Sequence, residues 1–496
     1  MRIGDCRHVG RLLQGRPEAE VRSVVYDSRR VEPGALFVAL PGRKVDGHDY
    51  VAEAVRRGAV GVVVERPVAV PPEVAVLAVD SSRVALGRLA ALHYRHPSRR
   101  LRVVGVTGTN GKTTTTHLVK RVLEEWGHRV GLTGTVHTLI GGEERPASLT
   151  TPQASDLQEL LYRMAEGGCT YAVMEASSEG LDMNRVDDVE FDLGIFTNLT
   201  QDHLDYHGSF EAYREAKAKL FRLLGQPGFK ARKAAVINLD DPAGEFYRGL
   251  CQVPVYTYGL DPRAMVRAEE IAVTAQSTRF RLVTPHGEIS LALKLVGRFN
   301  VYNALAAAAA GLAEGVELPA IQRALEAEEG VAGRLQPVRA GQPFGVFVDY
   351  AHSPDSLENV LRTAQGFTRG RLICVFGCGG DRDRTKRPIM GRIAGELADI
   401  TIITSDNPRS EEPGQIVKEI EAGLRPALAP GHFYEVVLDR AEAIRRAVEM
   451  AEPDDVILIA GKGHETYQIF KDRTIEFDDR AVARSLIEAR VGKGGA

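Results

Sequence analysis

The chain has 496 residues, more than one hydrophobic core usually serves, so several domains are expected. Apolar residues make up 44% and charged residues 26%, a balance typical of a soluble globular protein. The 63 basic and 66 acidic residues leave a formal net charge of -3, which excludes a general attraction to nucleic acid or anionic membranes. No basic stripe accompanies aromatic stacking residues, which disfavours DNA binding.

The N-terminal sequence MRIGDCRHVGRLLQGRP scatters arginines and has no continuous apolar stretch, so it does not predict a secretory signal. We therefore expect a cytoplasmic protein. The small-apolar run at 304–313 is about half of the ~20 residues that cross a bilayer, and it predicts a buried helix. The five cysteines are too few and too widely spaced for a disulfide framework. Cys374 and Cys378 are predicted to pack in a core, with zinc binding as the weaker alternative.

The chain divides into three α/β series, which predict an α/β fold with three domains at 1–98, 99–333 and 334–496. The first is a small α/β domain. The second has a mainly parallel sheet covered by helices, and the third is Rossmann-like. Apolar strands are predicted at 24–26, 35–40, 60–64, 101–106, 171–176, 193–199, 234–239, 345–348, 372–376, 400–404 and 456–459, with a helix at 116–126.

A Gly-rich turn follows the strand at 101–106, in the sequence VVGVTGTNGKTTTT. Glycines let backbone amides approach phosphate oxygens, and the start of the next helix favours an anion. Lys112 can reach the β- and γ-phosphates of a nucleotide, and Thr113 can bind magnesium. The general pattern has glycine where this chain has Val106. The turn predicts a nucleotide site made by Gly108, Thr109, Asn110, Gly111, Lys112, Thr113 and Thr114.

Two later strands also end in polar residues. Glu175 closes a buried strand, and a carboxylate there, close to a phosphate loop, is suited to hold magnesium directly or through water. After the strand at 193–199 come His203 and His207, which a helix would place on one face as a zinc pair. No third soft ligand is suggested nearby, so zinc is the weaker interpretation.

Nine motifs occur in the order seen in Mur ligases: TGTNGKTT, MEASS, TNLTQDHLDYHG, the stretch from Tyr213 to Phe221, GRFNVYN, FVDYAHSPDSL, VFGCGGDRDRTKRP, SDNPR and GKGHE. The chain therefore resembles the Mur ligase family over essentially its whole length. The resemblance implies a UDP-sugar-binding domain at 1–98, an ATP-binding domain at 99–333 and an amino-acid-binding ligase domain at 334–496. It also implies ATP-dependent amide formation in bacterial peptidoglycan precursor synthesis, with small-molecule substrates. A monomer is the default expectation.

The resemblance assigns roles around the nucleotide. Lys112 and Thr113 match the family's phosphate-loop residues, and Glu175 and His203 match its magnesium-binding residues. Two magnesium ions are implied. Lys217 matches the lysine that carries a carbamate in the family (N6-carboxylysine).

Four residues further along the chain also match positions that act on ATP in the family. Asn300 and Asn303 resemble its nucleotide-contacting asparagines, and Arg334 and Asp349 resemble residues that close over ATP. Catalytic roles are thus implied for Lys112, Lys217, Arg334 and Asp349.

For the UDP-muramoyl peptide, the resemblance points to Ser28, Thr150, Thr151, Ser177 and Arg185. The sequence departs from the usual pattern at Glu179, where many relatives have histidine, and at Met183, where some have glutamine. These departures put the detailed substrate contacts in question.

The sequence SDNPR resembles relatives that add meso-diaminopimelate. That amino acid carries a second carboxylate, which an arginine guanidinium can bind with two charge-assisted hydrogen bonds. The family positions that contact it correspond to Arg387, Asp406, Asn407, Arg409, Gly461 and Glu465.

Three alternatives remain. A lysine-adding ligase would differ at Asn407 and Arg409, and a folylpolyglutamate-type ligase should lack the SDNPR and GKGHE pair. From a different class, a P-loop nucleotide switch would hydrolyse ATP without an amino-acid pocket.

Overall fold

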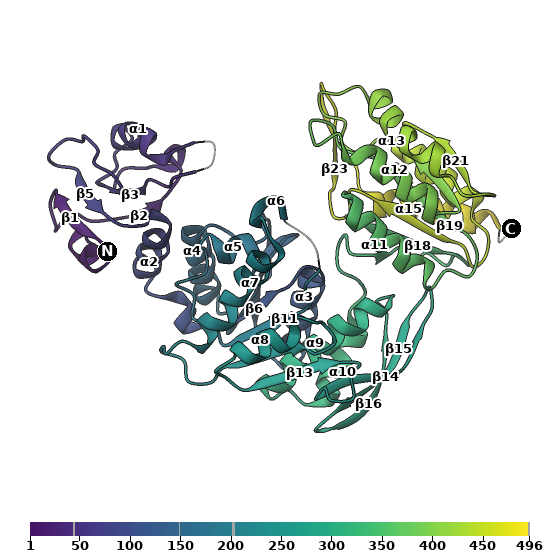
Figure 1. The fold of residues 1–496 in the computed structure, drawn as a ribbon, viewed down its shortest axis with the longest axis horizontal. Coiled ribbons are helices and arrows are strands. Elements are labelled where there is room, and N and C mark those ends of the chain that lie inside the picture. The colour runs from purple at the N-terminus through teal and green to yellow at the C-terminus, as the bar shows by residue number, and fades with distance from the viewer. Residues whose placement is uncertain (43–44, 148, 201–203, 495–496) are drawn as a thin grey trace. The chain divides into compact units, whose positions relative to one another are not determined.

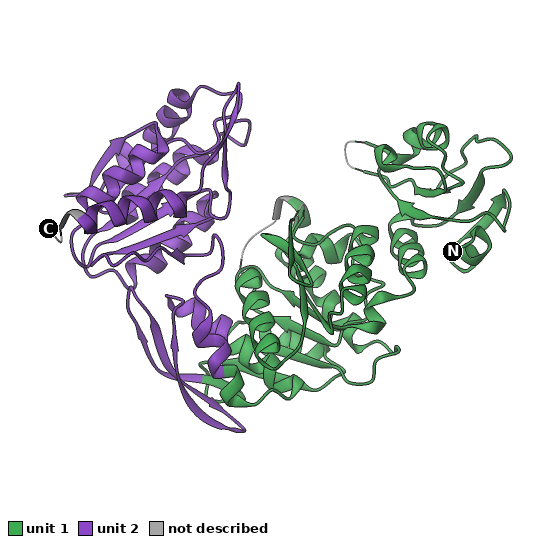
Figure 2. Ribbon diagram, turned by 180° about the vertical axis from the view of Figure 1, so that it is seen from behind, with its two compact units in different colours: residues 1–267, 305–321 green, residues 268–304, 322–496 purple. Residues whose placement is uncertain are grey.

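The computed structural model describes residues 1–42, 45–147, 149–200 and 204–494. The chain forms two compact units (Figure 2). The first comprises Met1–Arg267 with Leu305–Ile321, and the second comprises Ala268–Ala304 with Gln322–Ala496. The chain first passes between them within β14 (Val266–Val273).

The N-terminal part of the first unit is a five-stranded sheet in the order β1-β5-β4-β3-β2 (Figure 1). Only β1 is antiparallel to its neighbour. Leu36 and Val38 pack in one hydrophobic cluster while Phe37 packs in another, so both faces of the sheet are buried, as a parallel sheet requires. The elements are η1 (Ile3–His8), β1 (Arg11–Gln14), β2 (Ser23–Val25), η2 (Ser28–Arg30), β3 (Ala35–Val38), η3 (Gly47–Tyr50), α1 (Val51–Arg56), β4 (Gly61–Val64), β5 (Ala75–Ala78), α2 (Ser82–His93) and η4 (Pro97–Arg100).

The same unit also contains eight neighbouring strands of a larger, eleven-stranded sheet, in the order β13-β12-β11-β6-β10-β7-β8-β9. The strands from β13 to β7 are parallel, and β8 and β9 form an antiparallel hairpin at one edge. Because β6 lies between β10 and β11, its carboxyl end lies where the connections diverge, the usual ligand position in such sheets. The elements are β6 (Arg102–Thr107), α3 (Lys112–Glu125), β7 (Val130–Thr133), β8 (His137–Ile140), β9 (Glu143–Pro146), α4 (Ala154–Glu166), β10 (Tyr171–Glu175), α5 (Ser178–Asp182), β11 (Leu193–Phe196), α6 (Leu204–His207), α7 (Phe210–Gly225), β12 (Ala234–Asn238), α8 (Gly244–Leu250) and β13 (Val255–Gly259).

The second unit contains a six-stranded sheet in the order β17-β18-β22-β19-β20-β21, parallel except for β17. Separate hydrophobic clusters cover its two faces. The elements from β15 onward are β15 (Thr278–Thr284), β16 (Gly287–Leu293), α9 (Arg298–Glu314), α10 (Leu318–Ala327), β17 (Gln336–Pro337), β18 (Gly345–Asp349), α11 (Pro354–Gln365), β19 (Leu372–Phe376), α12 (Lys386–Leu397), β20 (Ile400–Ile403), α13 (Pro413–Ala427), β21 (Phe433–Val436), α14 (Arg440–Met450), β22 (Val456–Ala460), β23 (Tyr467–Ile469), β24 (Thr474–Glu476) and α15 (Asp479–Gly494).

The predicted α/β class with mainly parallel sheets is confirmed. The apolar run at 304–313 lies in α9 and is buried, as predicted. The division into two compact units does not test the three predicted domains, whose boundaries stay predictions. No helix in the described part of the chain is long and apolar enough to cross a membrane.

Candidate functional site

The phosphate loop follows β6 and is held by the end of β11. The Thr109 amide donates to the Asn198 carbonyl at 2.8 Å, and the Asn110 amide donates to Asn198 Oδ1 at 2.9 Å. Gly108 has φ +149°, and a Cβ there would lie 1.9 Å from Thr197 Oγ1. Only glycine therefore fits this approach between neighbouring strand ends. The loop ends at Gly111, where α3 begins.

Lys112 curls back over the loop that precedes it. Its Nζ donates to the carbonyls of Gly108 at 2.9 Å and Thr109 at 2.8 Å. Thr113 and Thr114 are buried in the first turn of α3. The turn thus combines an ammonium group with a helix N-terminus, which is the chemistry that binds nucleotide phosphates.

Lys217 on α7 is buried beside the same loop. Its Nζ donates to the Gly108 carbonyl at 2.8 Å and lies 4.3 Å from the centre of the Tyr213 ring. The Tyr213 hydroxyl is 2.9 Å from Thr109 Oγ1. Tyr213 was named from the sequence only as the start of the family-like stretch 213–221, with no role of its own, although it is the aromatic residue one helical turn before Lys217. The structure brings Lys112 and Lys217 to one carbonyl oxygen.

Glu175 lies at the end of β10, where it pairs with Val106 of β6. Its side chain is 1% exposed, and its carboxylate accepts from the Thr135 amide at 2.8 Å and the Thr135 hydroxyl at 3.0 Å. Thr135 Oγ1 is in turn 3.1 Å from Thr150 Oγ1. These oxygen donors fit magnesium, a hard cation that prefers carboxylate and hydroxyl oxygen. Thr135 was also missed from the sequence. His203 lies outside the described residues.

A second polar cluster surrounds the start of α5. Thr151 Oγ1 accepts from the Ser177 amide at 2.9 Å and donates to the Glu175 carbonyl at 2.9 Å. Arg185 Nη1 donates to the Thr151 carbonyl at 2.9 Å. The predicted residues Thr151, Ser177 and Arg185 therefore lie together.

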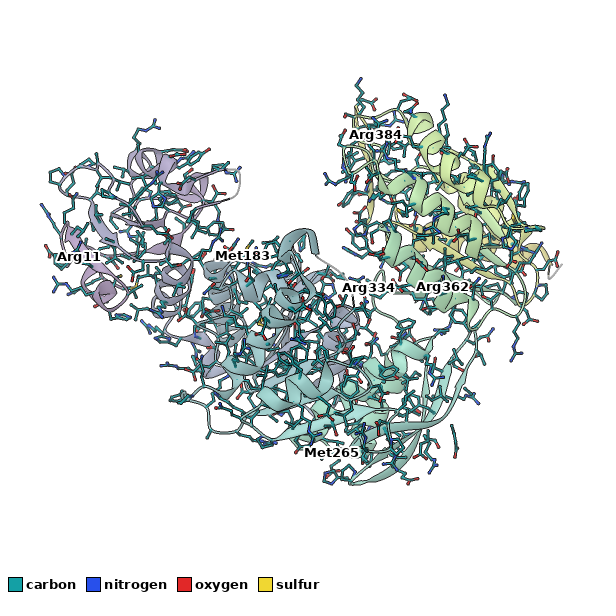
Figure 3. The ribbon with its side chains drawn as sticks, in the orientation of Figure 1. Arg11, Met183, Met265, Arg334, Arg362 and Arg384 are labelled. Atoms are coloured by element: carbon teal, nitrogen blue, oxygen red, sulfur yellow. The ribbon has the colours of Figure 1, made fainter. Side chains whose placement is uncertain are left out.

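Arg185 is a buried cation with unused hydrogen-bonding capacity. Burial lowers its pKa, and Nη2 donates to the sulfur of Met183 at 3.1 Å; Met183 is labelled in Figure 3. Among the described residues its buried Nε has no hydrogen-bond partner. Because buried charges are normally paired, Arg185 is suited to bind an anionic group such as a substrate carboxylate.

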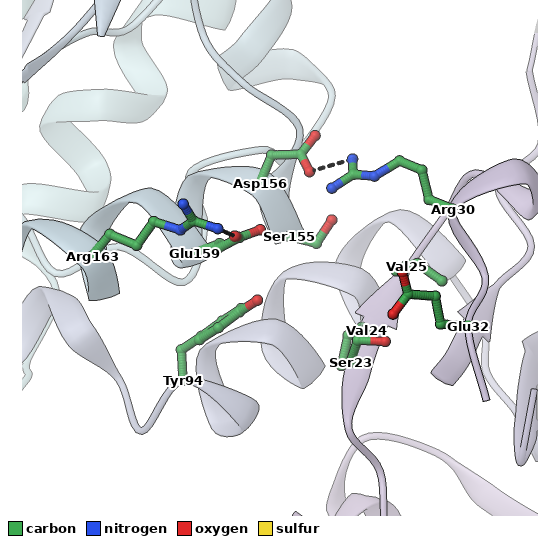
Figure 4. A pocket seen from close by; sticks show the side chains of 10 residues that line it. All are labelled: Ser23, Val24, Val25, Arg30, Glu32, Tyr94, Ser155, Asp156, Glu159 and Arg163. Carbon is green, nitrogen blue, oxygen red and sulfur yellow. Dashed lines mark hydrogen bonds and ion pairs between the residues drawn. The ribbon is translucent and has the colours of Figure 1, made fainter. Parts of the chain in front are cut away.

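Ser28 lies apart from that cluster in the N-terminal sheet region. It is buried, and its hydroxyl donates to Glu53 Oε2 at 3.2 Å. A pocket of about 440 Å³ opens between β2, α2 and α4, but Ser28 does not line it (Figure 4). There Asp156 accepts from Arg30 at 2.8 Å and from the Tyr26 hydroxyl at 2.9 Å.

In the second unit, polar side chains gather beyond the carboxyl ends of β20 and β22. Asn407 Nδ2 donates to Glu465 Oε2 at 2.8 Å, and Lys462 Nζ donates to the same oxygen at 2.9 Å. Gly461 has φ +114°, and a Cβ there would lie 2.4 Å from Asp406 Oδ2. Burial raises the pKa of Asp406. Asp406, Asn407, Gly461 and Glu465 therefore form one site, together with Lys462.

Lys462 was missed from the sequence although it lies inside the GKGHE motif. The signal available in the sequence is that a charged residue stands two positions after the end of a buried strand. Such a side chain must find polar partners when it is buried.

The two predicted arginines take different environments. Arg409 has φ +53°, and its Nη1 donates to the Gly380 carbonyl at 2.8 Å. Arg387 is fully buried and is bound by Glu411 at 2.8 and 2.9 Å and by Glu419 at 2.8 Å. The guanidinium of Arg387 is thus already bound by two carboxylates of the protein. Its link to the amino-acid site is indirect, through a 3.2 Å hydrogen bond to the Gly379 carbonyl.

The other residues that were predicted to bind the nucleotide lie in the second unit. Asn303 Nδ2 donates to Asn300 Oδ1 at 3.0 Å, and Asn300 Nδ2 donates to the Val296 carbonyl at 2.9 Å. Asp349 accepts from the Leu335 and Ala351 amides at 2.7 and 2.9 Å. Burial raises the pKa of Asp349, and the charge of Arg334 opposes that rise (Figure 3).

Cys374 and Cys378 lie in a hydrophobic cluster, as their packing interpretation predicted. Burial raises the pKa of both thiols to about 12. Within the described residues, no group of three or more His, Cys, Asp or Glu side chains is arranged to hold a metal.

A lysine-bearing phosphate loop at the carboxyl end of a parallel sheet defines the P-loop nucleotide-binding class. Comparisons with known proteins narrow this class. Profiles of three domains match the chain: Mur ligase family, catalytic domain, at 20–94; Mur ligase middle domain at 106–311; and Mur ligase, glutamate ligase domain, at 333–463.

The UDP-N-acetylmuramoyl-L-alanyl-D-glutamate--2,6-diaminopimelate ligase of Geobacillus thermodenitrificans (strain NG80-2) is 49% identical over 95% of this chain and 96% of its own. Its namesake in Geobacillus kaustophilus (strain HTA426) is 48% identical over the same shares. A solved structure of a ligase with this name has a TM-score of 0.72 at 33% identity, covering 99% of both chains. The chain belongs to the Mur ligase family.

Proposed function

We propose that the protein is an ATP-dependent amide ligase that adds meso-diaminopimelate to UDP-N-acetylmuramoyl-L-alanyl-D-glutamate. The observation that carries the proposal is the polar site of Asn407, Lys462 and Glu465, in a chain that also has a phosphate loop. A nucleotide switch would not need this second site. The names of the relatives that match nearly the whole chain support the same substrates.

The reaction begins with activation of a carboxylate. An oxygen of the terminal D-glutamate carboxylate attacks the γ-phosphorus of ATP, and ADP leaves, giving an acyl phosphate. The amine of diaminopimelate then attacks the acyl carbon, loses a proton, and expels phosphate from the tetrahedral intermediate. Lys112 offsets negative charge on the phosphates, and Arg185 holds the substrate carboxylate. Roles in ATP binding are also proposed for Asn300, Asn303, Arg334 and Asp349.

Magnesium is proposed to be held by Thr113, Glu175 and His203, with a second ion between phosphate and substrate. When bound, it would neutralise phosphate charge. The observation that supports this site is the buried oxygen cluster of Glu175 and Thr135.

Lys217 is proposed to carry a carbamate. A neutral lysine amine adds carbon dioxide, which forms an N–C bond and releases one proton, and the product is an anion that cations stabilise. The support is its position, since Lys217 is buried against Gly108 of the phosphate loop.

The specificity for diaminopimelate is proposed to come from Arg409 and Asn407, with Glu465 binding an ammonium group of the amino acid. Arg409 carries a guanidinium beside this site, suited to the second carboxylate that lysine lacks. Ser28, Thr150, Thr151, Ser177 and Arg185 are proposed to contact the UDP-muramoyl peptide. Because ATP and UDP-linked precursors are cytoplasmic metabolites, we propose that the reaction takes place in the cytoplasm. We also propose that the enzyme acts as a monomer.

The test is ADP release by the purified protein with ATP, magnesium and UDP-N-acetylmuramoyl-L-alanyl-D-glutamate, with meso-diaminopimelate or L-lysine added in parallel. We expect turnover with diaminopimelate and a UDP-linked product whose mass is greater by one diaminopimelate residue. Turnover with lysine alone would overturn the role of Arg409 but keep the ligase. ATP hydrolysis that ignores both amino acids would favour a nucleotide switch, and turnover only with a folate and glutamate would favour the folate-type ligase.

A further inference from the structure

Two histidine rings face each other beside the helix that follows the phosphate loop. His117 lies on α3, one turn after Thr113, and His137 is the first residue of β8. Their Nε2 atoms are 3.2 Å apart, and their ring centroids are 5.1 Å apart. The proposed amide-forming reaction uses neither residue.

The contacts of the other ring nitrogens indicate where the hydrogens lie. His117 Nδ1 is 2.8 Å from the Thr113 carbonyl oxygen, and His137 Nδ1 is 2.9 Å from Glu144 Oε1. A carbonyl or carboxylate oxygen only accepts, so each Nδ1 carries the hydrogen of its contact. A neutral imidazole of that tautomer has a lone pair on Nε2. When both rings are neutral, the lone pairs of the two Nε2 atoms lie on the facing sides of the rings, where one cation can bind both nitrogens.

The separation of the two nitrogens suits a metal ion. Two imidazole nitrogens bound to one tetrahedral zinc ion, each at about 2.0–2.1 Å, lie about 3.3–3.4 Å apart. The observed separation is 3.2 Å. A carboxylate on the far nitrogen, here Glu144, is the usual outer partner that orients a metal-binding histidine. The His137 side chain is 15% exposed and that of Glu144 is 66% exposed, so ions can reach the pair from solvent.

We propose that His117 and His137 bind a transition-metal dication of the zinc class through their Nε2 atoms. Among the described residues no third His, Cys, Asp or Glu joins them, and water is proposed for the remaining coordination positions. Imidazole selects zinc, nickel and copper, whereas magnesium prefers oxygen ligands, so this site is distinct from the proposed magnesium site. The bound ion would join α3, which carries Lys112 and Thr113, to the hairpin of β8 and β9.

The test uses the tag-free, full-length protein in excess magnesium, which occupies oxygen sites. Cobalt(II) absorption and zinc-dependent thermal unfolding are measured. We expect one equivalent of ion to bind and to raise the melting temperature, because a ligand that binds only the folded state stabilises it. His117→Gln and His137→Gln should abolish both signals.

Controls separate this site from others. His128→Gln in the same unit and Cys251→Ser should leave binding unchanged. Glu144→Gln, at a position where the side chain is 66% exposed, should weaken binding by about 10- to 100-fold without abolishing it, because it removes only the outer partner. Binding that survives both histidine substitutions would overturn the proposal. So would the absence of binding by the unsubstituted protein, which would assign a shared proton to the pair instead.

Discussion

Lys462 Nζ lies 2.9 Å from Glu465 Oε2 and 3.2 Å from Asn407 Oδ1, with a side chain that has no exposed surface. An ammonium group only donates, so Lys462 fixes the oxygen of the Asn407 amide toward itself. The amide nitrogen then points to Glu465, to which it donates at 2.8 Å. Lys462 is therefore a positioning residue for both side chains.

Lys462→Met should raise the KM for diaminopimelate by roughly tenfold or more, because a hydrogen bond to a charged group contributes about 1.5–3 kcal/mol. The KM for ATP should change little. Steady-state kinetics with each substrate varied in turn measures this split. Lys471→Met, at an exposed position, is the control. A lower melting temperature without any KM difference would show a purely structural lysine.

Arg409→Lys should reduce kcat/KM for diaminopimelate by roughly 10- to 100-fold, since lysine keeps the charge but loses the paired guanidinium donors. Lysine substitution also removes the donor to the Gly380 carbonyl. Competition between diaminopimelate and L-lysine in one reaction, read by product mass, gives the specificity directly. Arg362→Lys, whose arginine pairs with Glu358 on α11, should be neutral. Unchanged diaminopimelate turnover in Arg409→Lys would argue against its role.

Lys217→Met should lower kcat by about a hundredfold or more, the usual effect of removing a group that stabilises transition-state charge. Lys219→Met is the matched control, because Lys219 lies two residues away and pairs with Asp187. With ¹³C-labelled bicarbonate, NMR should show a carbamate signal in the unsubstituted protein and in Lys219→Met. The same signal in Lys217→Met would place the carbamate elsewhere.

Gly461→Ala should abolish diaminopimelate turnover, because its φ of +114° is unfavourable for alanine and the new Cβ would lie 2.4 Å from Asp406 Oδ2. Gly414→Ala is the matched control in the same unit, since no atom lies within 4 Å of a Cβ there. The prediction is tested by measuring diaminopimelate turnover and the circular dichroism spectrum of both variants. Full activity of Gly461→Ala would mean that the site tolerates a shift of Asp406.

The parallel sheets could be predicted because their strands are continuous apolar runs that end at glycine or polar residues. The phosphate loop could also be recognised from the sequence, because all of its residues are contiguous. The resemblance to Mur ligases supplied residues far apart in the chain, such as Asp406 and Gly461, and the structure places these two in contact.

Contacts that depend on tertiary packing were not predictable. Nothing local in the sequence indicates that Glu411 and Glu419 bind Arg387, because these carboxylates lie on a later segment. Thr135 and Lys462 were missed because a polar residue next to a strand usually faces solvent. What packs on such a side chain decides whether it is enclosed: Lys462 is fully buried, and Thr135 is half-buried against Glu175.

Asp188 supplies a prediction about the pH dependence of stability. Burial raises the pKa of its carboxyl to about 6, with Arg88 opposing the rise, while the unfolded chain has the ordinary value of 3.8. Between these values the unfolded state loses its proton while the folded state retains it. Stability from this group is therefore complete below pH 3.8 and is lost as the pH rises through about 6.

Asp188→Asn should remove this loss of stability. The free energy of unfolding of the variant should therefore change less than that of the unsubstituted protein between pH 4 and pH 7. The gain at pH 7 should be no more than about 2 kcal/mol after allowance for solvent screening. Thermal unfolding of the full chain across this range is the measurement, with Asp80→Asn at an exposed position as the control. Parallel pH curves for Asp188→Asn and the unsubstituted protein would mean that Asp188 ionises normally, with water reaching the carboxyl beside Gly87 on α2.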